Sequence, residues 1–100
     1  MTATPGRIVQ YVLSADDAER INSRRVADPA SGNPVIHGGI YPAMVVQTFG
    51  GPAVNLQVFL DGGDSYWATS RNEDAGTVDA PDLPAGTSYK GGTWHWPERT

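Results

Sequence analysis

The chain has 100 residues, no cysteine and a formal net charge of -4 at pH 7. Its length suits one small domain, and the lack of cysteine excludes disulfides, thiolate metal sites and a cysteine nucleophile. Proteins that coat nucleic acid are expected to be basic, so the acidic balance argues against nucleic acid as a partner.

Glycine and proline are abundant, with 12 and 8 copies. Such a load is found in disordered chains. Here, however, 39% of the residues are hydrophobic and they are clustered, which favours a β-rich domain with many tight turns. No apolar run approaches the roughly 20 residues that span a bilayer, and no secretory signal is visible, so we expect no membrane partner.

The first part of the chain predicts a leader, a strand and a helix. Residues 1–6 are expected to form a flexible leader that ends in a Pro-Gly turn. Arg7–Leu13 is rich in β-branched and aromatic residues, which is typical of a strand. Ser14 can cap a helix over residues 15–25, because acidic side chains follow it in the first turns. Residues 26–39 are rich in turn formers and predict a long loop.

The middle of the chain predicts a β-meander. Its three strands are expected over Ile40–Thr48, Val54–Leu60 and Tyr66–Arg71. The segments between them, residues 49–52 and 61–64, are glycine-rich and suit tight turns. In the second strand apolar residues recur at every other position, which is the pattern of a half-buried strand.

The last part of the chain predicts a second long loop and a short strand. Residues 72–92 are polar and contain several Asp, Pro and Gly residues, and loops of this length are often functional. Thr93–Trp96 is expected to close the sheet. Trp94 and Trp96 would then share one face of this strand, with His95 on the surface.

These elements predict a single, mainly β domain over residues 7–100. We expect a small SH3-like barrel or a strongly bent β-meander of about five short strands, with one short α-helix after the first strand.

The sequence contains no motif of a catalytic or metal-binding site. His37 and His95 are the only histidines, and nothing near them supplies a third ligand at metal-binding spacing. There is no nucleophile elbow and no phosphate-cradling glycine-rich loop before a helix. We therefore predict a non-enzymatic protein without a catalytic residue, metal or cofactor.

The one basic cluster lies near the end of the predicted helix, at Arg20, Arg24 and Arg25. These side chains can hold phosphate, or they can offset the helix dipole and pair with carboxylates. The second interpretation is favoured, because acidic residues one helical turn away weaken any local positive field.

Aromatic residues are the strongest indication of function. Strand alternation places Phe59 on the face opposite the apolar positions of its strand, and Trp67 opposite Tyr66. Either the helix covers this second face or aromatic surface remains for a partner. We predict a partner interface, with the arginines in ion pairs, made by Phe59, Trp67, Tyr89, Trp94, Trp96, Arg24 and Arg25.

Several motifs are distinctive together: YPAMVV over residues 41–46, AVNLQVFLDG over 53–62, YWATS over 66–70 and, above all, GTWHWPE over 92–98. With GRIVQYVL over residues 6–13, they resemble a family of small proteins encoded by actinobacterial bacteriophages and prophages. Residues 72–90 depart most from that pattern and look like an insertion. The resemblance implies a phage origin and a small β-domain, and it carries over no catalytic residue.

Together these observations predict a phage structural accessory protein, for example one that decorates the capsid. Its partners would be further copies of itself or other phage structural proteins, in the virion and, during assembly, in the host cytoplasm. The alternative is an intracellular phage effector that binds a host protein or sequesters a defence nucleotide between aromatic and arginine side chains. A DNA-binding SH3-like domain is disfavoured by the charge.

Overall fold

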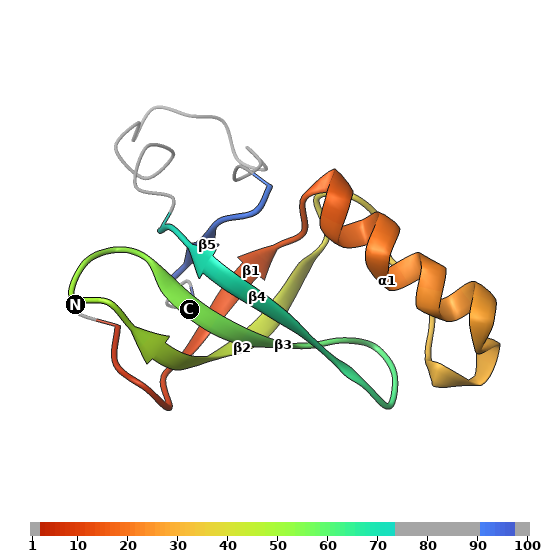
Figure 1. The fold of residues 1–100 in the computed structure, drawn as a ribbon, viewed down its shortest axis with the longest axis horizontal. Coiled ribbons are helices and arrows are strands. Elements are labelled where there is room, and N and C mark those ends of the chain that lie inside the picture. The colour runs from red at the N-terminus through yellow and green to blue at the C-terminus, as the bar shows by residue number, and fades with distance from the viewer. Residues whose placement is uncertain (1–2, 74–90, 98–100) are drawn as a thin grey trace.

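The computed structural model describes residues 3–73 and 91–97. They form one antiparallel sheet with the strand order β4-β3-β2-β1-β5, one α-helix and one short 3-10 helix (Figure 1). In chain order the elements are β1 (Ile8–Val12), α1 (Ala15–Ala27), η1 (Pro29–Ser31), β2 (Ile40–Thr48), β3 (Val54–Phe59), β4 (Ser65–Arg71) and β5 (Trp94–His95).

The predicted mainly β architecture is confirmed, with the meander β2-β3-β4 and a helix after the first strand. The sheet is not closed into a barrel. In the described residues, the chain just after β4 meets β5 at an isolated parallel bridge between Glu73 and Trp94. There the backbone N–H of Trp94 donates to the carbonyl of Asn72 at 3.1 Å.

Helix α1 begins at the predicted residue and ends later than predicted. The Ser14 hydroxyl accepts a hydrogen bond from the Asp17 backbone N–H, and the Asp17 carboxylate accepts one from the Ser14 N–H, which is a capping box. The helix continues to Ala27, so the first two residues of the predicted loop are helical. It ends at Asp28 because the residue before Pro29 is biased away from the helical conformation.

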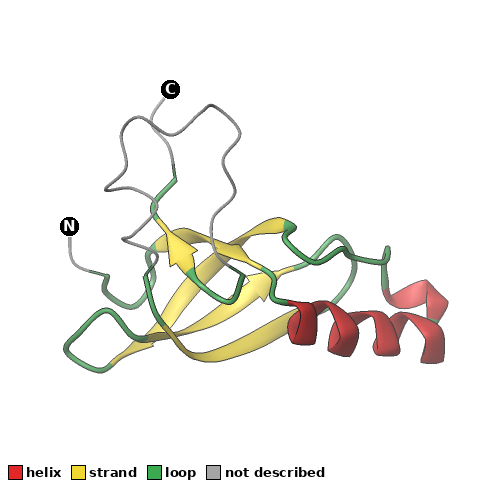
Figure 2. Cartoon of the chain, turned by 90° about the horizontal axis from the view of Figure 1, so that it is seen from above, coloured by secondary structure: helices red, strands yellow, loops and turns green. Residues whose placement is uncertain are grey.

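The core lies on one face of the sheet, which we call the inner face. Burial in β3 alternates as predicted, and the apolar residues at every other position are buried. Helix α1 lies at one end of the sheet and extends away from it (Figures 1 and 2), and it adds Ala18 and Ile21 to the core. Asn22 then attaches the following loop, because its side-chain amide donates to and accepts from the backbone of Val35 at 2.9 and 2.8 Å.

The described part of the predicted flexible leader, residues 3–6, is held against the sheet. The N–H of Gly6 donates to the carbonyl of Val45 at 2.8 Å, and Ala3 packs against the core. This segment therefore continues the pairing with β2 beyond the start of β1.

A bulge in β4 decides which way Arg71 points. Thr69 and Ser70 lie together opposite Asn55, whose side-chain oxygen accepts from the Ser70 N–H at 2.7 Å and the Thr69 hydroxyl at 2.9 Å. Ser70 has a φ of 55°, in the left-handed region that side chains other than glycine rarely adopt. The extra residue reverses the alternation, so Arg71, paired with Val54, points to the inner face.

Candidate interaction surface

The opposite, outer face of the sheet carries a row of side chains that crosses four strands. The strand register places Ile8 beside Met44, Met44 beside Gln57, and Gln57 beside Trp67. Residues directly opposite one another in antiparallel strands share a face, so these four side chains form one line from β1 to β4.

Several large apolar side chains on this face are exposed to solvent. Trp67 is 56% exposed, Ile8 45%, Phe59 43% and Val46 38%. Clustered apolar exposure of this kind marks interaction sites more often than scattered single residues do. We use the name outer face for the set Ile8, Met44, Val46, Gln57, Phe59 and Trp67.

On strands β1 to β4 the outer side of the sheet contains no ionisable side chain. None of the outward positions of β1 to β4 is Asp, Glu, Lys or Arg, although 18% of the chain is charged. Depletion of charge at the centre, together with Trp, Phe and Met, is the composition of protein–protein interface cores. Two of the aromatic residues predicted from the sequence, Phe59 and Trp67, lie here.

Trp94 and Trp96 lie elsewhere. Trp94 is 1% exposed and belongs to the core, where its indole N–H lies 3.2 Å from the carbonyls of Pro52 and Arg71. Trp96 is partly buried and packs edge-on against it, with ring centroids 5.6 Å apart. His95, expected on the surface, is 3% exposed and lies 3.0 Å from the side chain of Gln10 in the neighbouring strand.

A strand of two residues is too short for the alternation of buried and exposed side chains to show which side faces the core. Pairing with β1 and contact with the segment after β4 enclose β5, so its tryptophan serves the core and not a surface. Tyr89, also predicted at the interface, lies outside the described residues.

Arg24 and Arg25 form ion pairs within the chain. Arg25 is buried and binds both carboxylate oxygens of Asp64 at 2.9 and 3.0 Å. The more exposed Arg24 lies 3.4 Å from the same carboxylate and donates to the carbonyl of Ser65 at 2.9 Å. Hydrogen bonds from Arg25 hold the pKa of Asp64 below its usual range. Both arginines therefore join α1 to the β3–β4 turn, and neither lies on the outer face.

Two glycine backbones also meet near this contact between α1 and the β3–β4 turn. Gly32 pairs with Gly62 as an isolated bridge, and Arg25 also donates to the carbonyl of Asn33 at 2.9 Å. A side chain at Gly62 would lie 2.4 Å from the carbonyl oxygen of Ser31. The close approach therefore requires glycine at this position.

A buried carboxylate, that of Asp17, is the centre of a polar cluster on the inner face. Besides its capping contacts, it accepts hydrogen bonds from the hydroxyls of Tyr11 and Tyr66, the latter at 2.7 Å. Arg71 donates to it at 3.1 Å. Asp17 is fully buried, and the cluster joins α1 to β1 and β4. Sequence patterns identified Asp17 as a first-turn acid and gave no sign of these distant partners.

This cluster predicts that stability falls on both sides of neutral pH. Burial alone would raise the pKa of Asp17, but the hydrogen bonds from Tyr11, Ser14 and Tyr66 and the Arg71 charge outweigh it, so the pKa is lowered. Burial and the bond to Asp17 raise the pKa of Tyr66 above its usual 10.0. The contribution of the Asp17 carboxylate to stability is present above its unfolded pKa of about 4, and it is lost as the pH falls through the pKa of the folded state. The phenol's contribution is present below about pH 10 and lost as pH rises.

Urea unfolding at a series of pH values measures this effect. We expect a plateau between roughly pH 5 and pH 9, with a loss on each side. Tyr66→Phe should make the alkaline loss shallower, whereas Tyr41→Phe, outside the cluster, should leave it unchanged. An alkaline limb that is equally steep in both variants would contradict the assignment.

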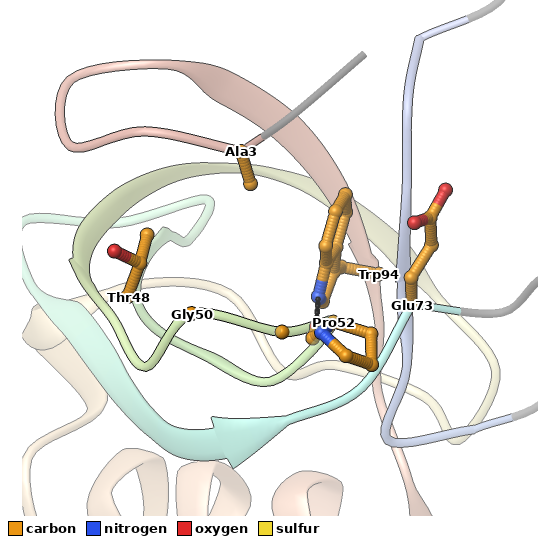
Figure 3. A pocket seen from close by; sticks show the side chains of 7 residues that line it. Ala3, Thr48, Gly50, Pro52, Glu73 and Trp94 are labelled. Carbon is orange, nitrogen blue, oxygen red and sulfur yellow. Dashed lines mark hydrogen bonds between the residues drawn. The ribbon is translucent and has the colours of Figure 1, made fainter.

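A pocket of about 330 Å³ lies near one end of the sheet, between the N-terminal segment and the β2–β3 turn (Figure 3). Glycine and proline backbone, Thr48 and Glu73 make up much of its wall, and the indole N–H of Trp94 is already bonded to Pro52. Among residues 3–73 and 91–97, no group of three or more His, Asp or Glu side chains is placed to hold a metal ion. No helix in the same residues is long and apolar enough to cross a membrane.

No family model, curated protein or solved structure matches this chain.

Proposed function

We propose that this chain is a non-enzymatic structural accessory protein of a bacteriophage, such as a capsid decoration protein, that acts through protein–protein contacts of its outer face. The observation that supports this proposal is an uncharged surface with Trp67 and Phe59 exposed at 56% and 43%. Large aromatic side chains in an uncharged patch supply much of the binding energy in protein interfaces. The phage origin rests on the sequence resemblance described above.

The proposal includes an SH3-like arrangement of the sheet. The order β4-β3-β2-β1-β5 returns β5 to the outer edge of β1, and the hydrogen bond from Trp94 to Asn72 links this edge toward the end of β4. This link would protect the adjoining ends of both edge strands from pairing with other chains. Slow amide exchange of Trp94 would support the link, and exchange as fast as in an exposed loop would contradict it.

Quantitative mass spectrometry of purified particles tests the function. We expect the wild-type chain in every particle in many copies, and we expect Trp67→Glu to lower its copy number at least tenfold, since a buried unpaired charge costs several kcal/mol. Val26→Glu is the matched control, because Val26 is 83% exposed on α1 and lies away from the outer face. Absence of the wild-type chain from particles would overturn the virion role.

The alternative role in sequestering a nucleotide receives no support from the basic cluster. Arg24 and Arg25 both bind the Asp64 carboxylate, so this carboxylate already holds both guanidinium groups against the β3–β4 turn.

A further inference from the structure

We propose that the occupant of the outer face is a second copy of the same chain, packed face to face. The two-fold axis lies in the interface between the two sheets, parallel to the strands and above the space between β2 and β3. This inference deepens the proposed function and rests on the same surface.

The first argument is electrostatic. Each copy carries a net charge of -4, so two copies repel wherever their charged surfaces meet. The outer face has no ionisable side chain, and contact there brings no like charges together and leaves no charge buried without a partner. A partner that relied on a charged patch would find no complement on this face, whereas an identical face is matched to it.

The second argument is the order of the side chains in the row that crosses the sheet. An aliphatic residue, Ile8, lies at one end and the indole of Trp67 at the other, with Met44 and Gln57 between them. The two ends are three strand spacings apart, about 14 Å. Rotation about the proposed axis exchanges the ends of the row, so Trp67 of each copy lies on Ile8 of the other.

The middle of the row also fits this arrangement. The same rotation places Gln57 of one copy on Met44 of the other. The Gln57 side-chain oxygen keeps its hydrogen bond from the Ser65 hydroxyl at 3.1 Å, and the Met44 sulfur is a weak acceptor for the Gln57 amide N–H groups. Sheets packed in this way lie about 10 Å apart with nearly aligned strands.

The free edges of the sheet are a poorer place for a second copy. The bulge at Thr69 and Ser70 interrupts β4. At the start of this strand, the carbonyl of Ser65 already accepts a hydrogen bond from Arg24. The opposite edge strand, β5, has two residues. A bulged or very short edge is a common protection against edge-to-edge pairing.

The small size of the outer face favours a weak interaction. It comprises six side chains, and interfaces smaller than the roughly 800 Å² per partner of a standard stable complex are often transient. We therefore expect a reversible dimer in the micromolar range. Sedimentation velocity of the full chain between about 1 and 200 µM should show a shift from monomer to dimer.

Charge-pair variants test the predicted contact. Ile8→Lys and Trp67→Glu should each weaken dimerisation at least tenfold, because each buries two charges opposite apolar groups. The double variant Ile8→Lys/Trp67→Glu should restore it to within a few-fold of wild type, because the two-fold axis then pairs Lys with Glu twice. Within one chain these positions are about 14 Å apart, so their pairing requires a second copy. Val26→Lys should dimerise like wild type.

Two results would overturn the inference: a wild-type chain that is monomeric throughout, or a double variant as weak as the single ones. Circular dichroism confirms that each variant is folded, and Trp67→Ala provides a milder variant if Trp67→Glu is not. A monomeric chain that still binds particles through Trp67 would overturn the dimer and leave the proposed function standing. A chain that dimerises but is absent from particles would overturn the proposed function and leave the dimer standing.

Discussion

Asp17→Asn is expected to lower the free energy of unfolding by about 3 kcal/mol or more, a large part of the stability of a domain of this size. The carboxylate is fully buried and accepts hydrogen bonds from two tyrosine hydroxyls, the Ser14 N–H and Arg71. An amide in its place presents two donors to groups that are themselves donors, and it leaves the arginine without its counter-charge. Urea unfolding at neutral pH measures the loss.

Asp16→Asn is the matched control for this prediction. Asp16 precedes Asp17 in the first turn of α1 but is exposed, so it loses no more than its interaction with the helix dipole, about 0.5 kcal/mol. If Asp17→Asn does not fold, Tyr66→Phe should still fold and lose about 1–2 kcal/mol by removal of one hydrogen bond to the carboxylate. Equal stabilities of the Asp16 and Asp17 variants would contradict the central position of this carboxylate.

Gly62→Ala is expected to cost about 2–3 kcal/mol, because it forces two backbones apart. The added Cβ would lie 2.4 Å from the Ser31 carbonyl oxygen and 2.7 Å from the Gly32 Cα. Separation of these segments would also strain the hydrogen bond from the Gly63 N–H to Ser31, at 2.8 Å, and the nearby ion pair between Arg25 and Asp64. Thermal and urea unfolding measure the effect.

Gly51→Ala separates this clash from the general cost of replacing a glycine. Gly51 also lies in a turn between two strands of the meander, but a Cβ there meets nothing within 4 Å and its φ is not positive. We expect a change within about 0.5 kcal/mol. A Gly62 variant as stable as the Gly51 variant would show that the η1 segment is not held against the β3–β4 turn.

The elements of the fold could be predicted because their signals are local. The alternation of apolar residues in β3 and the glycine-rich turns around it define the meander, and Ser14 with the acids after it marks the start of α1. These patterns lie within a few residues of the structure that they predict. They also place Phe59 and Trp67 on the exposed face of the sheet.

The tertiary contacts could not be predicted from those patterns. Asp17 has local capping contacts, but its further partners Tyr66 and Arg71 are 49 and 54 residues away. Arg71 reaches it because one extra residue in β4 reverses the alternation, and no period-two pattern indicates such a bulge. The burial of Trp94 is likewise not predictable from its strand, because two residues carry too little alternation to show which side faces the core.

Oxidative footprinting of Trp67 by mass spectrometry tests the role of the outer face most directly. We expect Trp67 to be oxidised readily in the dilute chain and to be strongly protected both in concentrated protein and on purified particles. Buried Trp94 is the internal reference and should react little in every sample. Equal oxidation of Trp67 in the dilute, concentrated and particle-bound chain would contradict the claim that this face is the interaction surface.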